Sequence, residues 1–271
     1  MTVPFVERQG YRIHYQSEGP VGAPPLLLIM GLGMASDAWD TLPGKLAGRF
    51  RVITFDNRGV GQSSASPWGF RIRDLADDAA SVLDAARVES ASVFGISMGG
   101  MIAQQLVLRY PERVRSVVLG ATFGSHLRSR KPSPGVARDL LLVGLLARRG
   151  KFLSRLLVSD EFLAGNRERF DRWLAGLHQA RRAAVRRQLV AIAFHEAEAG
   201  LHHLRTPTLV ISGDRDRLVP VENSRRLSRI IPRARLLELP GAGHAFPFER
   251  PVETIRALTE HCLAAHTLAA G

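Results

Sequence analysis

The sequence predicts an α/β fold in which a mostly parallel sheet is flanked by helices and interrupted by a helical insertion. Over residues 1–121, and again after residue 205, short β-rich runs alternate with longer helical ones. This alternation is typical of parallel strands joined by helical connections. Several β-rich runs are almost continuously apolar, as expected for strands that helices cover on both faces. With 271 residues, 45% of them hydrophobic, the chain can bury one substantial core.

Eight strands are predicted, six of them before the insertion. The six are FVERQG, YRIHYQ, PLLLIM, RVITF, SASVFG and RSVVLGA, starting at residues 5, 11, 25, 51, 90 and 115. The two that follow the insertion are TPTLVISGD from residue 206 and ARLLELP from residue 234. Helices are predicted over 36–48, 72–86, 98–110 and 221–230, and from residue 251 onward. The third helix ends before Pro111, because proline lacks the N–H donor that a helix interior needs.

Strand signals vanish in the middle of the chain, where three helices are predicted over 134–150, 166–179 and 181–200. The two strands that follow could hardly bury a core alone. We therefore interpret residues 124–204 as a helical insertion in one α/β core, whose first part is residues 1–123 and whose second part is residues 205–271.

The net charge of +12 lies mostly in and around this insertion. Residues 126–205 contain 16 Lys and Arg against 7 Asp and Glu, which accounts for nine of the twelve net charges. The chain has no basic tail, zinc finger or basic motif interleaved with aromatic residues. We therefore predict a solvated, arginine-rich surface and no nucleic-acid partner. The sequence makes no prediction of the oligomeric state.

A single cysteine, Cys262, excludes an intramolecular disulfide framework and fits a reducing compartment. The first 16 residues lack a charged segment followed by an apolar one, so no signal peptide is predicted. The longest apolar stretches fall short of the ~20 residues that a bilayer-spanning helix needs. We expect a cytoplasmic protein without stable membrane insertion.

Ser97 lies in the stretch VFGISMGGM, between a buried-type strand and a predicted helix. A serine hydroxyl is a poor nucleophile, so catalysis requires exposure, a base within reach and donors for the oxyanion. A sharp turn from strand to helix exposes the hydroxyl and places it at a helix N-terminus. Gly95 and Gly99 provide the room that such a turn needs. The pattern G-x-S-x-G in this context predicts a nucleophile elbow.

Two further motifs follow in the order that a serine nucleophile requires. DRDRLVP follows the strand TLVISG, and PGAGHAFPFERP follows the strand ARLLEL. With the elbow, these motifs resemble the α/β-hydrolase superfamily. FDNRGVGQSS at 55–64 is similar to the family's D-x-R-G-x-G-x-S segment, and the insertion lies where the family has its cap domain. The resemblance covers essentially the full chain and predicts an eight-stranded sheet with an inserted helical cap.

The resemblance implies a catalytic triad of Ser97, Asp216 and His244. In the family pattern the acid stands four residues before a proline, here Pro220, which selects Asp216 over Asp214. His244 follows a glycine in a predicted turn. The other eight histidines fall in the insertion or on strand and helix patterns away from a loop at the active end.

The resemblance also implies an oxyanion hole built from two backbone N–H groups. One belongs to Met98, directly after the nucleophile, and the other by position to Leu32 in the loop after PLLLIM. The family usually has histidine and glycine before the second donor. This chain has Met30 and Gly31 there.

These features predict hydrolysis of a carboxylic ester of a hydrophobic small molecule, through an acyl-enzyme on Ser97. No metal and no organic cofactor is implied. MGLGM and SMGG look similar to bacterial small-molecule esterases, including methylesterases, and to cofactor-free haloperoxidases. The haloperoxidases tend to carry an aromatic residue where Leu32 stands, which favours hydrolysis over perhydrolysis.

Several alternatives stay open. The same triad would serve a perhydrolase or a C–C bond hydrolase, and the same fold serves cofactor-free oxygenases or lyases and non-catalytic receptors. The apolar stretch LLLVGLLA from Leu140 is interpreted as ordinary cap packing, with a substrate-lining role and weak contact with an anionic membrane as alternatives. Arg148, Arg149, Arg186 and Arg187 are interpreted as solvated side chains or as contacts to an acidic group of the substrate.

Overall fold

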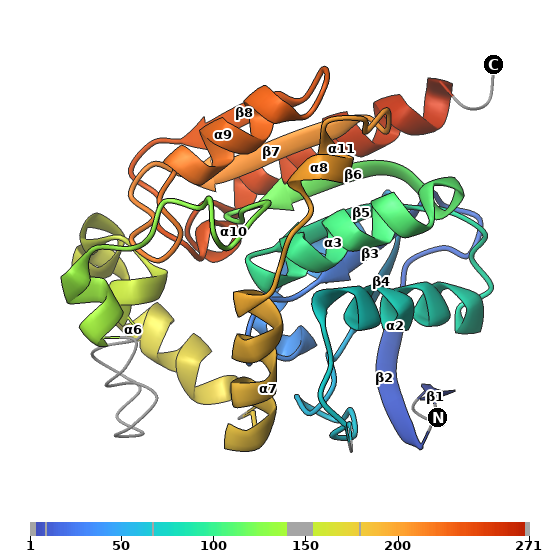
Figure 1. Ribbon diagram of the computed structural model, residues 1–271, viewed down its shortest axis with the longest axis horizontal. Helices are drawn as coiled ribbons and strands as arrows, with labels where there is room; N and C mark the ends of the chain where they lie inside the picture. Colours follow the sequence, from blue (N-terminus) through green and yellow to red (C-terminus); the bar gives the residue numbers. More distant parts are fainter. Residues whose placement is uncertain (1–3, 9, 67, 140–153, 179, 269–271) are drawn as a thin grey trace.

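Eight strands form one sheet in the order β1-β2-β4-β3-β5-β6-β7-β8 (Figure 1). The computed structural model describes residues 4–8, 10–66, 68–139, 154–178 and 180–268. The strands are β1 (Phe5–Arg8), β2 (Tyr11–Glu18), β3 (Pro25–Ile29), β4 (Arg51–Phe55), β5 (Ala91–Ile96), β6 (Val114–Gly120), β7 (Thr208–Gly213) and β8 (Arg235–Leu239). β2 runs antiparallel to β1 and β4, and the five remaining pairs are parallel. The predicted α/β class and all eight predicted strands are confirmed.

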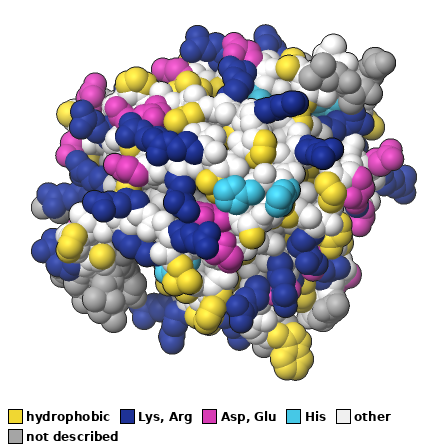
Figure 2. All heavy atoms as spheres, turned by 45° about the horizontal axis from the view of Figure 1, so that its top comes forward, with side chains coloured by type: hydrophobic (Ala, Val, Ile, Leu, Met, Phe, Trp, Pro, Cys, Tyr) yellow, Lys and Arg dark blue, Asp and Glu magenta, His cyan; other side chains and the backbone are white. Residues whose placement is uncertain are grey.

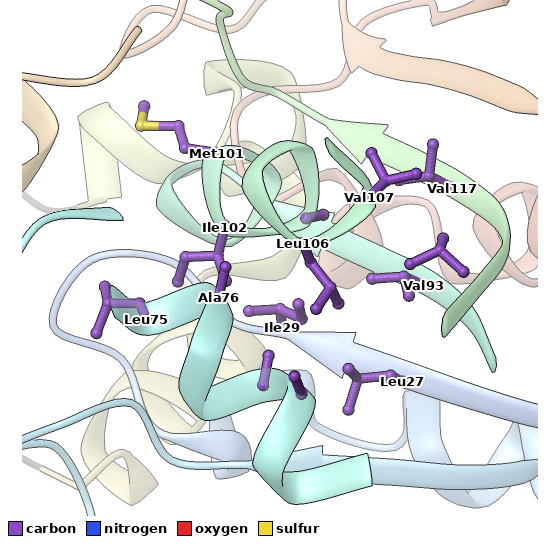
Figure 3. Close-up of a cluster of buried hydrophobic side chains, with 14 of the residues drawn as sticks. Leu27, Ile29, Leu75, Ala76, Val93, Met101, Ile102, Leu106, Val107 and Val117 are labelled. Atoms are coloured by element: carbon purple, nitrogen blue, oxygen red, sulfur yellow. The ribbon is translucent and has the colours of Figure 1, made fainter. Parts of the chain in front are cut away.

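Helices cover both faces of the sheet. α2 (Ile72–Ala85), α3 (Met98–Arg109) and α9 (Glu222–Ile230) contribute to the apolar cluster on one face, and α1 (Leu42–Leu46) and α11 (Pro251–Leu268) to the cluster on the other. Successive side chains of a strand point to opposite faces. In β3, Leu27 and Ile29 therefore belong to the first cluster, and Leu26 and Leu28 to the second. Figure 3 shows Leu27 and Ile29 facing the side chains of α2 and α3.

The helical segment lies between β6 and β7 and contains α6 (Asp160–Gly176), α7 (Arg182–Ala193) and α8 (Glu198–Leu201). The prediction of one helix over 181–200 was wrong, because the backbone of residues 195–197 bonds to residues 124–126 instead of continuing the helix. Glu196 forms an isolated bridge with Ser125, and the Ala197 N–H donates to the Gly124 carbonyl at 2.8 Å. Residues 140–150 of the predicted first helix, with LLLVGLLA, Arg148 and Arg149, lie outside the described residues. The division into core and cap stays a prediction.

The helix predicted over 36–48 is split into a 3-10 turn, η1 (Ser36–Trp39), and α1. Asp40 separates them, because its φ of 53° lies in the left-handed region and breaks the helical path. Two short elements were not predicted: η2 (Pro111–Arg113) and α10 (Phe246–Glu249).

The basic side chains are spread over the surface instead of gathering at one place on the face that Figure 2 shows, where acidic side chains lie among them. Arg186 is exposed, whereas Arg187 is half-buried and donates to the Ser66 carbonyl. Among the described residues, no helix has the length and apolar character to cross a bilayer.

Candidate active site

Ser97 occupies a strained turn between β5 and α3. Its φ of 58° and ψ of −120° lie outside the regions that non-glycine residues ordinarily adopt. Backbone hydrogen bonds hold it there: its N–H donates to the Gly120 carbonyl at 2.8 Å, and its own carbonyl accepts from the Thr122 hydroxyl at 2.7 Å. The side chain is only half-buried. The turn therefore presents the hydroxyl at the carboxyl edge of the sheet.

The two glycines that flank Ser97 permit close contacts between backbones. A Cβ on Gly95 would lie 2.1 Å from the Gly99 carbonyl oxygen, and a Cβ on Gly99 would lie 2.0 Å from the Ile29 carbonyl oxygen. Real Cβ atoms do not approach a backbone oxygen so closely. Gly95 thus lets the turn close on itself, and Gly99 lets α3 start against the end of β3.

Asp216 and His244 form a buried pair. Asp216 follows β7, and its Oδ1 accepts hydrogen bonds from the N–H groups of Leu218 at 2.9 Å and Val219 at 2.8 Å. Its Oδ2 lies 2.8 Å from His244 Nδ1. The two residues are only 6% and 5% exposed. The carboxylate is thus held by its own loop and directed at one nitrogen of the imidazole.

Asp214, the other carboxylate of this loop, has a different partner. Its Oδ1 accepts a hydrogen bond from the Gly241 N–H at 2.7 Å, at the surface. Gly213 directly precedes Asp214, and Ala242 lies two residues before His244. A Cβ on Gly213 would lie 2.1 Å from the Ala242 carbonyl oxygen. The end of β7 and the turn before His244 are therefore in direct contact.

Phe246 brings the His244 turn toward the elbow. Its ring lies 6.3 Å from that of Phe94 in β5, and a Cβ on Gly120 would meet it at 3.1 Å. Gly120 is the residue that accepts the Ser97 N–H. The Ser97 hydroxyl itself has no hydrogen-bonded partner among the described residues. The structure thus joins Asp216 to His244, but does not join His244 to Ser97 by a hydrogen bond.

The loop after β3 lies against Ser97. A Cβ on Gly31 would be 3.2 Å from the Ser97 Cβ. Neither the N–H of Leu32 nor that of Met98 donates to another atom of the described residues. The assignment of these two N–H groups to an oxyanion hole stays a prediction.

Polar side chains hold this loop from two sides. Asn57 Nδ2 donates to the Met30 carbonyl at 3.0 Å. Gln188 of α7 is fully buried, and its Oε1 accepts the Gly33 N–H at 2.8 Å. Sequence reasoning missed both residues: Asn57 stands inside the FDNRGVGQSS segment, whereas Gln188 is one polar position in a helix and carries no sequence signal.

Two further side chains of reactive types, His178 and Cys262, lie outside the proposed triad. The helix predicted over 166–179 includes His178, but His178 follows the end of α6, and its Nδ1 lies 2.6 Å from Asp37 Oδ2, close to the loop after β3. Cys262 is buried, and burial raises the pKa of its thiol to about 11, so it is unreactive at neutral pH. Among the described residues, no group of three or more His, Cys, Asp or Glu side chains could hold a metal ion.

Comparisons with known proteins show the fold family to which the chain belongs. Residues 24–251 match the family model described as the alpha/beta hydrolase fold. The chain is 31% identical over 240 residues to a Mycobacterium tuberculosis protein named as a non-heme bromoperoxidase, BpoC, covering 84% of this chain and 89% of that protein. It is 32% identical over 244 residues to a Variovorax paradoxus protein named as a carbamate hydrolase, RutD, covering 86% and 89%. Among solved structures, an enol-lactonase from Burkholderia xenovorans superposes with a TM-score of 0.83 at 25% identity, covering 95% of this chain and 99% of that one.

Proposed function

Since the chain belongs to the α/β-hydrolase fold family, we propose that it is a serine hydrolase that cleaves a carboxylic ester of a hydrophobic small molecule. The buried contact of 2.8 Å between His244 Nδ1 and Asp216 Oδ2 carries this proposal. A carboxylate on one imidazole nitrogen leaves the other free to act as a base. Ser97, on the strained turn at the same edge of the sheet, is the nucleophile that this base serves.

The reaction proceeds in two stages. The Ser97 oxygen attacks the ester carbonyl while its proton moves to His244 Nε2, and the same proton then goes to the departing alcohol. Water gives a proton to His244 and attacks the acyl-serine carbonyl, which releases the acid and restores the hydroxyl. Asp216 keeps the Nδ1 proton in place throughout.

The negative charge on the carbonyl oxygen is stabilised by the N–H groups of Leu32 and Met98. Each such donor contributes about 3 to 4 kcal/mol of transition-state stabilisation. Because both donors are backbone groups, the replacement of the family's usual histidine by Met30 leaves the chemistry intact. Asn57 takes part by holding the Met30 carbonyl, which orients the loop.

An apolar substrate is supported by the residues next to this loop. Met34 contacts an apolar cluster that includes Trp173 of α6 and Phe248 of α10, whose rings stack at 4.6 Å. A related enzyme named as an enol-lactonase also acts, by its name, on a lactone, which is a cyclic ester.

The proposal is tested with p-nitrophenyl esters of increasing chain length. The wild type should hydrolyse them, with a preference for acyl chains longer than acetyl. Ser97→Ala, His244→Ala and the double variant should each lose about the same factor, on the order of 10⁶ in kcat, because the two residues act as a unit. A fluorophosphonate should label Ser97 stoichiometrically. Full activity of Ser97→Ala would overturn the covalent mechanism.

Perhydrolysis is a second candidate, favoured by the similarity to the protein named as a bromoperoxidase. The same acyl-serine would then be attacked by hydrogen peroxide instead of water, and a peracid would form. The wild type, incubated with acetate and hydrogen peroxide, is assayed for peracid. Formation of peracid faster than ester hydrolysis would make perhydrolysis the main activity. A methyl carbamate included in the ester series addresses the similarity to the protein named as a carbamate hydrolase.

A further inference from the structure

Glu249, at the end of α10, is a buried carboxylate that the reaction does not use. The residue is 6% exposed and forms no ion pair among the described residues. Its Oε1 accepts two backbone hydrogen bonds, from Gly243 at 2.8 Å and from Ser159 at 3.2 Å. Its Oε2 accepts from the Ser159 hydroxyl at 2.8 Å. Burial raises the pKa of this carboxyl group. Burying a carboxylate without a cationic partner costs free energy, so we ask what its hydrogen bonds do for the site.

Its two backbone partners come from segments that are far apart in the sequence. Gly243 directly precedes His244, whereas Ser159 caps the start of α6, ninety residues from Glu249 in the sequence. The segments also touch directly: the Ala245 N–H donates to the Leu157 carbonyl at 2.6 Å. A Cβ on Gly243 would lie 2.8 Å from Glu249 Oε1 and 2.9 Å from the Ser159 nitrogen. Ala245 is therefore hydrogen-bonded directly to the segment that precedes α6, and Gly243 is linked to it through Glu249.

The start of α6 also reaches the loop that carries the acid. Asp160, next to Ser159, forms an ion pair with Arg217, the residue after Asp216. Surface pairs of this kind are worth little individually. The buried hydrogen bonds of Glu249 are therefore a stronger link between the His244 turn and the start of α6 than this surface ion pair.

We propose that Glu249 is a positioning residue for His244: its Oε1, shared by the N–H groups of Gly243 and Ser159, locks the histidine turn against the start of α6. The geometry of the helical insertion is thereby coupled to the imidazole. This inference rests on the proposed function, since it assigns Glu249 a role in setting the direction of His244 toward Ser97.

Two substitutions of similar size distinguish the role of the Glu249 carbonyl oxygen as an acceptor from the role of its negative charge. Glu249→Gln keeps a carbonyl oxygen for both N–H groups and an amide that the Ser159 hydroxyl can accept from. Its kcat should stay within about threefold of the wild type. Glu249→Leu removes both oxygens and leaves three buried donors without their acceptor: the N–H groups of Gly243 and Ser159 and the Ser159 hydroxyl. Because misplacement of a reacting group by about 1 Å costs on the order of 100-fold, its kcat should fall by about that factor while KM changes little.

A second readout needs no substrate. In proton NMR, the low-field signal of the His244 Nδ1 proton should persist in Glu249→Gln and shift or broaden in Glu249→Leu. Glu260, exposed on α11, supplies matched controls: Glu260→Gln and Glu260→Leu should leave both readouts unchanged. If Glu249→Leu does not fold, Ser159→Ala, which removes the hydroxyl contact to Oε2 together with the cap that this hydroxyl gives the Phe162 N–H, should still lower kcat by about tenfold and perturb the same signal.

The outcomes distinguish this inference from the proposed function. Ester hydrolysis that survives Ser97→Ala or His244→Ala overturns the proposed function, and the NMR signal then decides the role of Glu249 alone. Loss of hydrolysis in those variants, together with a folded Glu249→Leu of unchanged kcat and unchanged signal, overturns the positioning role. So does a Glu249→Leu protein that is less stable but has wild-type kcat per folded molecule.

Discussion

His244 Nδ1 lies 2.8 Å from Asp216 Oδ2 although 28 residues separate them in the chain. The contact exists because β7 and the turn after β8 meet at Gly213, where only a glycine leaves room for the Ala242 carbonyl. The loop that carries Asp216 and the turn that carries His244 are thus held together by a close contact between their backbones. The same principle, close approach permitted by a glycine, places Ser97 beside the loop after β3.

Asp216→Asn should lower kcat by about 10⁴, because an amide facing Nδ1 holds the imidazole in the wrong tautomer. Asp214→Asn is the matched control, since the asparagine oxygen can still accept the Gly241 N–H, and its kcat should stay within about twofold. Both are measured on p-nitrophenyl esters. Equal losses in the two variants would contradict the assignment of Asp216 as the acid.

Gly99→Ala should destabilise the protein by about 3 kcal/mol, because the new methyl group would lie 2.0 Å from the Ile29 carbonyl oxygen. Gly165→Ala, on α6, has no heavy atom within 4 Å of its Cβ. That variant should be as stable as the wild type or more so. Urea unfolding of both variants provides the measurement, and a Gly99→Ala protein of wild-type stability would show that α3 can move away from β3.

Gln188→Met should lower kcat about tenfold, less than the hundredfold or more that loss of a whole oxyanion donor costs. The methionine has the same length as glutamine but cannot accept the Gly33 N–H, so the loop that carries Leu32 loses its anchor on α7. Leu189→Ala, at an exposed neighbouring position, should have wild-type kcat. If both variants have wild-type kcat, Gln188 is not needed to hold the loop.

His195 should make the protein lose stability as the pH falls. Burial lowers its pKa from 6.5 to about 4, so between these values the unfolded chain takes up a proton that the folded protein does not. The stability contribution is full above pH 6.5 and is lost progressively toward pH 4. At pH 5 the loss from this group is about 2 kcal/mol.

Comparison with His195→Gln isolates this effect from other titrating groups. The free energies of unfolding of both proteins are measured at pH 7.5 and pH 5.0. The free energy of unfolding should decrease between pH 7.5 and pH 5.0 by about 2 kcal/mol more in the wild type than in His195→Gln. An identical decrease in both proteins would mean that His195 is protonated in the folded state.

Much of this protein was predictable from local sequence. The strand signals are alternating or continuous apolar runs, and β4 has the predicted bounds of residues 51–55. Ser97 was identified from its glycine-flanked turn between a strand and a helix, and the resemblance to the α/β-hydrolase superfamily implied Asp216 and His244, each in a short motif after a strand. The predicted helix over 181–200 failed, because contacts with residues 124–126 outweighed local helix propensity there.

The sequence by itself determined the α/β class, the order of the strands along the chain and the three candidate residues, since these depend on periodicity and on motifs a few residues long. Only the tertiary structure decided which polar groups hold the site. Gln188 reaches Gly33 across 155 positions, and Ser159 reaches Glu249 across 90. The local sequence around each of these residues carries no sign of its partner. A buried hydrogen bond of this kind depends on where two distant backbone segments meet in the fold, which neither local sequence specifies alone.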